Sequence, residues 1–220
     1  SRIAGTFMNQ SEIASLDASK PEFSVIIPCL DEAETLGTCL EKIQAVAKNE
    51  NLELEIIVAD NGSKDGSQEI AEKHGARIVP VQKKGYGAAL MGGIEEGRGQ
   101  FVIMGDADDS YDFLELPKFV QALREGNELV QGCRLPNGGG LVLPGAMPWS
   151  HRHLGNPMFT HFVRRWFGSP INDVYCGMRG FTKELYSRLN MRCTGMEFAT
   201  EMIIKAAQVG AKTAEVPITL

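Results

Sequence analysis

Short apolar runs alternate along this chain with segments whose apolar residues recur at helical spacing, and this alternation constrains the fold most. From Phe23 onward, the runs 23–27, 56–59, 77–81 and 101–104 are each followed by a polar, turn-rich stretch. Strands and helices that alternate in this way are typical of βαβ units, with parallel strands covered by helices. The sequence therefore predicts an α/β fold with a Rossmann-like, mostly parallel sheet flanked by helices.

The turn-rich stretches lead into the expected helices. Asp31 and Glu34 are placed as a capping box before the first of them. Pro80 favours an edge position for the third strand, because proline has no amide hydrogen to give to a neighbouring strand. A further strand is expected at 129–131, and apolar spacing predicts helices at 36–47, 114–124 and 196–207.

Two carboxylates one residue apart, Asp106 and Asp108, directly follow the apolar run 101–104. The carboxyl end of a buried parallel strand is where α/β folds bind ligands. Hard oxygen donors at this place suit Mg²⁺ or Mn²⁺ carrying a diphosphate, because such ions fill their other positions with phosphate and water. A calcium-binding EF-hand is excluded, since Tyr111 stands where that loop needs glycine and Pro117 where it needs glutamate. The pair therefore indicates nucleotide chemistry.

Polar loops follow the other predicted strands as well. Asp31 and Glu32 come after the first strand, 60–63 after the second and 84–85 after the third. Because parallel strands present their carboxyl ends along one edge, we expect these loops to meet in one crevice. Carboxylates there can hold the base and ribose of a nucleotide, while lysine and a metal neutralise its phosphates.

Composition narrows the class of protein. The formal net charge of −6 argues against a general nucleic-acid binder, so we expect no nucleic-acid partner. Five scattered cysteines, without a C-x-x-C pair, favour a reducing compartment over a disulfide framework or a zinc site. No stretch reaches the roughly 18 consecutive apolar residues of a transmembrane helix. We therefore expect a soluble, cytoplasmic piece, whose oligomeric state the sequence does not indicate.

The segment 153–167 interleaves large apolar residues with basic ones, among them Arg164 and Arg165. Such a segment can lie on a membrane surface. It can equally be a helix that packs on the core and turns a basic face to solvent. Both interpretations stay open.

Six stretches of the chain resemble, in the same order, the family 2 glycosyltransferases of the GT-A fold. Within that family the chain is most similar to the dolichol-phosphate mannose synthase and polyprenyl-phosphate glucosyltransferase group. The resemblance implies a GT-A catalytic domain at 23–220, preceded by an N-terminal extension, 1–22, that we expect to be disordered. Relatives commonly continue into membrane helices, so we expect a domain truncated before them. The matching stretches are 25–32 (VIIPCLDE), 58–66 (VADNGSKDG), 84–89 (KGYGAA), 106–108 (DAD), 132–134 (GCR) and 173–181 (DVYCGMRGF).

The resemblance also implies a reaction: transfer of a hexose from a nucleotide-sugar to a polyprenyl or dolichyl phosphate, with inversion. A membrane partner and a place at the cytoplasmic face of a membrane follow from it. The stretches 109–112 and 138–140 look more like the glucosyltransferase branch, so UDP-glucose is favoured over GDP-mannose. Carried over by position, the resemblance assigns the base and ribose to Pro28, Asp31, Glu32 and Asp60, and the metal and diphosphate to Asp106 and Asp108 with Lys84 nearby. Ser110 stands where related mannosyltransferases have glutamine.

The acceptor decides whether a base is needed. A hydroxyl must lose its proton, whereas a phosphate monoester is largely dianionic at neutral pH and already nucleophilic. For a phosphate acceptor the site should supply cations, and guanidinium groups bind phosphate at two points. The candidates for this role are Arg134, Arg164, Arg165 and Arg179.

Asp173 matches the family's candidate base and equally suits a residue that orients one of these arginines. The expected catalytic residues are thus Asp108, Asp173 and Arg179. Two alternatives stay open: transfer to a saccharide or protein hydroxyl, with Asp173 as the base, and a non-catalytic module that binds nucleotide-sugars.

Overall fold

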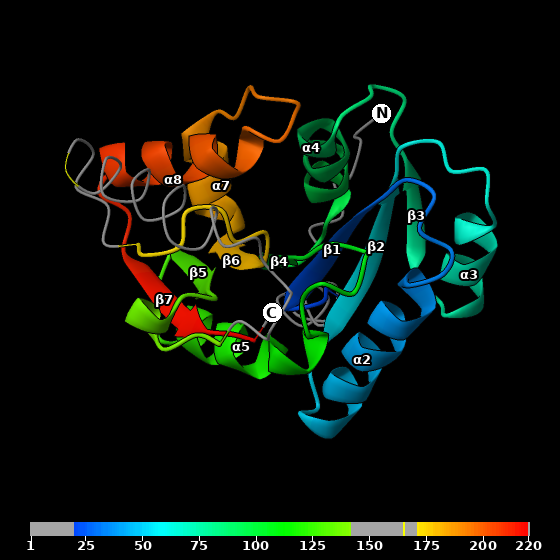
Figure 1. Cartoon of the computed structure of the whole chain (residues 1–220), viewed down its shortest axis with the longest axis horizontal. Coiled ribbons are helices and arrows are strands. Elements are labelled where there is room, and N and C mark those ends of the chain that lie inside the picture. The colour runs from blue at the N-terminus through cyan, green and yellow to red at the C-terminus, as the bar shows by residue number, and fades with distance from the viewer. Residues whose placement is uncertain (1–19, 142–164, 166–170, 220) are drawn as a thin grey trace, which may run out of the picture.

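The computed structural model of the chain describes residues 20–141, 165 and 171–219. These residues form a seven-stranded sheet in the order β3-β2-β1-β4-β6-β5-β7 (Figure 1). Six strands run in one direction, and β6 alone is antiparallel to its neighbours β4 and β5. The predicted mostly parallel sheet is therefore confirmed.

The strands fall on the apolar runs of the sequence. The central strand, β1 (Phe23–Cys29), is buried along its whole length, with Val25 opposite Ile56 of β2 and Ile103 of β4. The strand that contains Pro80 lies at the edge of the sheet, as the proline predicts. Besides β1, the predicted strands are β2 (Leu54–Asp60), β3 (Arg77–Pro80), which is the strand with the proline, β4 (Phe101–Met104) and β5 (Leu129–Cys133).

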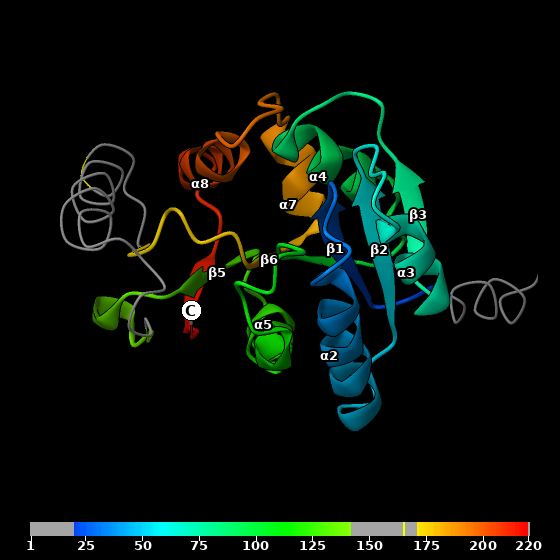
Figure 2. The same ribbon diagram turned by 45° about the vertical axis from the view of Figure 1, so that its right-hand side comes forward.

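Helices cover both faces of the sheet (Figure 2), and buried side chains form a separate apolar core on each face. Successive residues of β1 point to opposite faces, so Val25 and Ile27 lie in one core and Ile26 in the other. The first core is covered by α2 (Leu36–Asn49), α3 (Ser67–Lys73) and α5 (Leu116–Arg124), which follows the 3-10 helix η1 (Phe113–Glu115). The second is covered by α4 (Tyr86–Glu96), α7 (Lys183–Leu189) and α8 (Phe198–Gln208).

Three elements were not predicted: β6 (Arg179–Thr182), α7 and β7 (Thr213–Pro217). A second 3-10 helix, η2 (Pro136–Gly138), follows β5. The four residues of β6 include an arginine and a glycine, so they lack the apolar run by which the other strands are recognised. Because β6 lies between β4 and β5, these two strands are not hydrogen-bonded to each other.

The predicted capping box is wrong. Helix α2 begins at Leu36, and its N-cap residue Thr35 makes no side-chain capping bond. Asp31 has a left-handed backbone (φ 57°), and its carboxylate accepts the amide of Lys64 at 2.7 Å. Its side chain therefore joins the loop after β1 to the loop after β2 instead of starting the helix.

Part of the expected N-terminal extension lies against the domain. The amide of Glu22 donates to the carbonyl of Glu53 at 2.7 Å, and its carboxylate pairs with Arg124 at 2.5 Å. Apart from Arg165, the segment 153–167 lies outside the described residues. Within the described ranges, no helix is long and apolar enough to span a bilayer.

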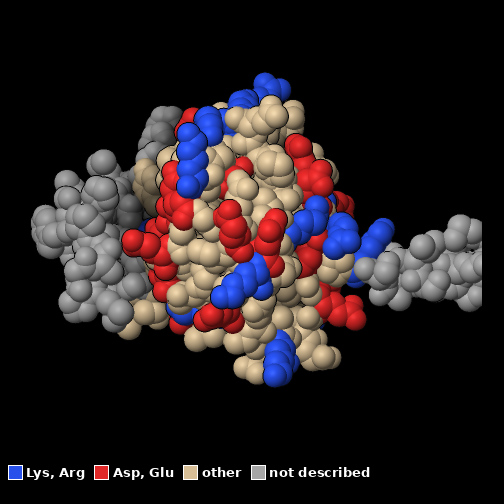
Figure 3. Space-filling model, turned by 90° about the vertical axis from the view of Figure 1, so that its right-hand side faces the viewer, with Lys and Arg blue, Asp and Glu red and all other residues tan. Residues whose placement is uncertain are grey.

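On the face that Figure 3 shows, acidic and basic side chains lie close together. The described residues include ion pairs: Arg77 of β3 pairs with Glu55 at 3.1 Å and with Glu96 at 3.2 Å. Ion pairs at the surface contribute little to stability, so we assign these pairs no further role.

Candidate nucleotide and metal site

The loops at the carboxyl ends of β1, β2 and β4 meet in a cavity of about 390 Å³. Its lining confirms that the polar loops converge, because parallel strands bring their ends to one edge. Five predicted site residues line the cavity: Pro28, Glu32, Lys84, Asp106 and Asp108. The remaining lining residues are Cys29, Leu30, Asn61, Gly85, Tyr86, Ala89, Ala107 and Met196.

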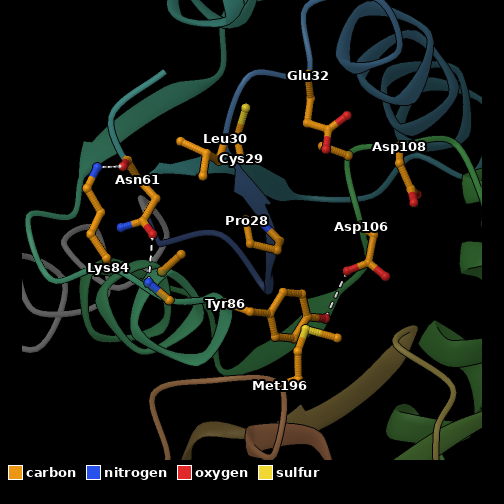
Figure 4. Close-up of a pocket in the computed structure, with 13 residues that line it drawn as sticks. Pro28, Cys29, Leu30, Glu32, Asn61, Lys84, Tyr86, Asp106, Asp108 and Met196 are labelled. Atoms are coloured by element: carbon orange, nitrogen blue, oxygen red, sulfur yellow. Dashed lines mark hydrogen bonds between the residues drawn. The ribbon is translucent and has the colours of Figure 1, made fainter. Parts of the chain in front are cut away.

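One side of this cavity is acidic. Glu32, Asp106 and Asp108 lie along it (Figure 4). The pKa of Asp106 is raised to about 6: burial is the largest cause and Asp108 adds to it, while Tyr86, Arg179 and Arg134 act in the opposite direction. Burial and then Asp108 also raise the pKa of Glu32. Carboxylates that disfavour one another in this way accept a cation readily, because it removes their repulsion.

Lys84 lies on the opposite side of the cavity from the acidic pair (Figure 4). Its ammonium group donates to the backbone carbonyl of Asn61. The Asn61 side chain in turn donates to the carbonyls of Val81 and Lys83, both at 2.8 Å, and accepts the amide of Gly85 at 2.9 Å. Asn61 thus fixes the loop that carries Lys84, a role the sequence did not reveal.

Asp31 and Asp60 do not line the cavity. Asp60 is only 2% exposed, and its carboxylate accepts the amides of Gly62 and Ser63 and the side chain of Gln68. Burial alone would raise the pKa of Asp60, but these hydrogen bonds lower it. In this structure both aspartates shape the loops next to the cavity.

The buried residues Arg134 and Asp173 form an ion pair, with Nε to Oδ2 at 2.7 Å and Nη2 to Oδ1 at 2.8 Å. Neither residue lines the cavity. The sequence left two roles open for Asp173, a base and a residue that orients an arginine. This contact is the one expected for the second role.

Arg179 is completely buried at the start of β6, and it also does not line the cavity. Its guanidinium donates to the carbonyls of Ala199 and Cys176, at 2.7 and 2.8 Å, and burial lowers its pKa. Arg179 and Arg134 act on the site through their charge, since both lower the pKa of Asp106. Of the other two arginines, Arg165 is exposed and Arg164 lies outside the described residues.

Tyr86 and Met196 complete the cavity. The Tyr86 hydroxyl donates to Oδ1 of Asp106 at 2.8 Å. Met196, from the loop before α8, is 71% exposed and lies beside the Tyr86 ring (Figure 4). Tyr86 belongs to the KGYGAA stretch, which pointed to it without giving its role. Apolar spacing put Met196 at the start of the helix predicted at 196–207, but α8 begins at Phe198 and Met196 lies outside it.

The donors present fit a divalent ion of the Mg²⁺ or Mn²⁺ type. Asp106 and Asp108 offer carboxylate oxygens at the edge of an open cavity. Among the described residues, no group of three or more His, Cys, Asp or Glu side chains forms a complete metal site. Two carboxylates, with phosphate and water for the other positions, are the set by which such ions bind together with a nucleotide.

Comparison with known proteins agrees with this geometry. The family model described as glycosyl transferase family 2 matches residues 24–189. Among curated relatives, the low-salt glycan biosynthesis hexosyltransferase Agl6 of Haloferax volcanii is 39% identical over 200 residues, which cover 90% of this chain and 48% of Agl6. A dolichyl-phosphate hexose transferase of the same organism is 30% identical over 198 residues, covering 90% of this chain and 82% of the relative. This chain thus spans about half the length of Agl6.

Solved structures share the fold. Glucosyl-3-phosphoglycerate synthase from Mycobacterium tuberculosis, in complex with Mn²⁺, uridine diphosphate and glucosyl-3-phosphoglycerate, matches with a TM-score of 0.71 and 21% identity. The match covers 100% of this chain and 77% of that one. The same enzyme with phosphoglyceric acid alone matches with a TM-score of 0.73 and 22% identity, covering 100% and 76% of the two chains. These likenesses confirm the GT-A fold.

Proposed function

The chain belongs to glycosyltransferase family 2 and is a transferase, and from this premise we propose its reaction. The protein transfers a hexose from a nucleotide-sugar to a polyprenyl or dolichyl phosphate, with inversion and with the help of Mg²⁺ or Mn²⁺. Membership of the family sets aside the alternative of a non-catalytic binding module.

A single observation carries this proposal. Asp106 and Asp108 line the same cavity as Pro28, Glu32 and Lys84. Without a cation, the acidic side would repel the diphosphate of a donor, because like charges would be brought together. We infer that the two aspartates hold the ion and the diphosphate with the help of Lys84, while Pro28 and Glu32 contact the nucleoside.

The chemistry needs little else from the protein. In the transfer, an acceptor oxygen forms a bond to the anomeric carbon as the bond from that carbon to the diphosphate breaks. A bound divalent ion would stabilise the charge that gathers on the departing diphosphate. The task of the chain is therefore to hold the donor so that one face of the sugar meets the acceptor.

The role of Asp173 bears on the acceptor. Asp173 is fully buried and paired with Arg134, which supports a role in orienting that arginine. A carboxylate held in this way is poorly placed to act as the base that a hydroxyl acceptor needs. A phosphate monoester needs no such base, since it is largely dianionic at neutral pH. The likeness to a relative named for dolichyl phosphate supports the same acceptor class. We expect the reaction to take place at the cytoplasmic face of a membrane.

The donor we favour is UDP-glucose. The stretches 109–112 and 138–140, which resemble the glucosyltransferase branch, support this choice. A solved structure of similar fold holds uridine diphosphate with Mn²⁺, which makes a uridine donor and Mn²⁺ natural first probes.

A transfer assay tests the proposal directly. The protein is incubated with UDP-glucose or GDP-mannose, Mn²⁺ or Mg²⁺, and a short-chain polyprenyl phosphate, and glycolipid formation is followed with a chelator as the control. We expect transfer from UDP-glucose that the chelator abolishes. Preference for a neutral sugar acceptor over the lipid phosphate would overturn the proposed acceptor, and transfer in chelator would overturn the metal.

A further inference from the structure

The Tyr86 hydroxyl links the first residue of α4 to the acidic loop after β4. Its bond to Oδ1 of Asp106 measures 2.8 Å, and the ring lies along the cavity beside Met196 (Figure 4). We propose that Tyr86 is a positioning residue, which fixes the Asp106 carboxylate in the orientation that receives the divalent metal. This inference rests on the proposed function, because it concerns the metal of that same reaction.

The other oxygen of Asp106 lies close to Gly177. A Cβ atom added to Gly177 would lie 2.6 Å from Oδ2, so a larger residue there would require the carboxylate or the chain to move. The amide of Gly177 donates to the Tyr111 hydroxyl at 2.9 Å, which holds the glycine in place. The Asp106 side chain is therefore confined between a hydroxyl donor on one side and the backbone of Gly177 on the other.

Asp108 is held differently. It is exposed, and the contact that its Oδ1 makes is with the amide of Ser110 at 3.0 Å, inside its own loop. Of the two candidate ligands, Asp106 is thus the one whose direction is set by residues distant in the sequence. A preorganised Asp106 would define the site, and Asp108 could adjust to the bound ion.

The bond to Tyr86 is compatible with metal binding. An ionised carboxylate has about four lone-pair positions, and the hydroxyl occupies only one of them. Hydrogen-bond partners of metal-binding carboxylates orient them, and losing such a partner typically weakens metal binding by about 10–100-fold. We expect a loss in this range when the hydroxyl is removed.

The test is Tyr86→Phe, which keeps the aromatic wall and removes only the hydroxyl. Mn²⁺ binding in the presence of UDP, followed by the paramagnetic resonance of free Mn²⁺, should be about 10–100-fold weaker than in the wild type. At saturating Mn²⁺ kcat should recover, since the hydroxyl does not touch the reacting atoms. Tyr186→Phe is the matched control, because this tyrosine of α7 stacks on Phe181 and does not line the cavity. Its Mn²⁺ affinity should stay close to that of the wild type.

The experiment distinguishes failure of the positioning role from failure of the proposed metal. Wild-type affinity in Tyr86→Phe would overturn the positioning role, and so would an equal loss in the two variants, which would indicate a general loosening of the protein. If the wild-type protein binds no Mn²⁺ with UDP, the metal in the proposed function fails and this inference fails with it. Melting temperatures of all three proteins show whether each is folded during the measurement.

Discussion

Arg134 surrounds the carboxylate of Asp173 with three donors. The guanidinium supplies two of them, at 2.7 and 2.8 Å, and the backbone amide of Arg134 supplies the third, at 3.0 Å. The amide of Asp173 is itself held by Glu215 at 3.1 Å. A carboxylate saturated in this way is well suited to fixing an arginine and the loop around it, and poorly suited to taking a proton from an acceptor.

We therefore predict that the main effect of Asp173→Asn is a loss of folding stability and not a direct effect on the transfer reaction. Removing one partner of a buried ion pair leaves the other charge uncompensated, at a typical cost of about 3–5 kcal/mol. The double variant Arg134→Met plus Asp173→Leu should lose less than Asp173→Asn alone, because neither charge then remains. Urea unfolding measures both. A stable but inactive Asp173→Asn protein would instead identify Asp173 as the base.

The second prediction concerns Asp108. Because this side chain is exposed and fills no core position, Asp108→Asn should change the free energy of unfolding by no more than about 0.5 kcal/mol. Turnover should be lost, since a ligand charge is removed from the site. The control is Asp112→Asn in the same loop, whose carboxylate caps η1 through Leu114 and does not line the cavity. Normal turnover by Asp108→Asn would remove Asp108 from the metal site, and failure of the variant to fold would give Asp108 a structural role instead.

Sequence patterns predicted the elements whose apolar residues follow a single period. The strands β1 to β5 and the helices α2, α5 and α8 were recognised in this way. The missed helix α7 has only seven residues, too few for a clear period, and β7 combines a buried valine with a terminal proline. The position of α7 depends on packing against β6 and α8, and that of β7 on pairing with β5, which local sequence does not encode.

The candidate site was predictable where it depends on strand ends. Glu32, Lys84, Asp106 and Asp108 line one cavity because parallel strands end at the same edge. The sequence did not place Lys84 across the cavity from Asp106, and it did not give Tyr86 its contact with that residue. These relationships depend on how α4 lies over the sheet, and a one-dimensional pattern cannot show them.

Glu201 gives a prediction about pH. Its carboxylate, on α8, accepts the amides of Arg192 and Cys193 and pairs with Lys205 at 2.7 Å. Burial alone would raise the pKa of Glu201, but Lys205 and the two amides outweigh it and lower the pKa from 4.5 to about 2. Since the folded-state pKa is depressed, the stability it contributes is complete above about pH 4.5 and is lost as the pH falls toward 2.

Acid unfolding of Glu201→Gln should show the difference. The variant should be less stable than the wild type at pH 7, and the gap should narrow between about pH 4.5 and 2. Denaturant titrations at several pH values measure this gap. A gap independent of pH would mean that the charge of Glu201 contributes nothing to stability.

Two glycines should respond in opposite ways to the same substitution. At Gly87 in α4, an added Cβ would lie 2.5 Å from the carbonyl oxygen of Cys193 and 2.8 Å from Cβ of Phe198. At Gly37 in α2, the nearest atoms are 3.6 and 3.7 Å away, which is ordinary contact. Gly87→Ala should therefore destabilise by about 1–3 kcal/mol through overpacking. Gly37→Ala should stabilise by up to about 1 kcal/mol, because alanine is the better helix former.

Thermal unfolding of the two alanine variants distinguishes the sites in one experiment. A rise in melting temperature for Gly87→Ala would show that the loop before α8 leaves room for a methyl group at the start of α4.

The single antiparallel strand, β6, determines where the long connection after β5 begins and ends. Because β5 and β6 are hydrogen-bonded neighbours, the chain that leaves the sheet at Cys133 re-enters it next to its point of departure, at Arg179. The two ends of the 45-residue connection between these points are therefore held next to each other. The entropic cost of closing such a connection grows only slowly with its length. Insertions in this connection should therefore cost little stability and leave the cavity-lining loops after β1, β2 and β4 in place.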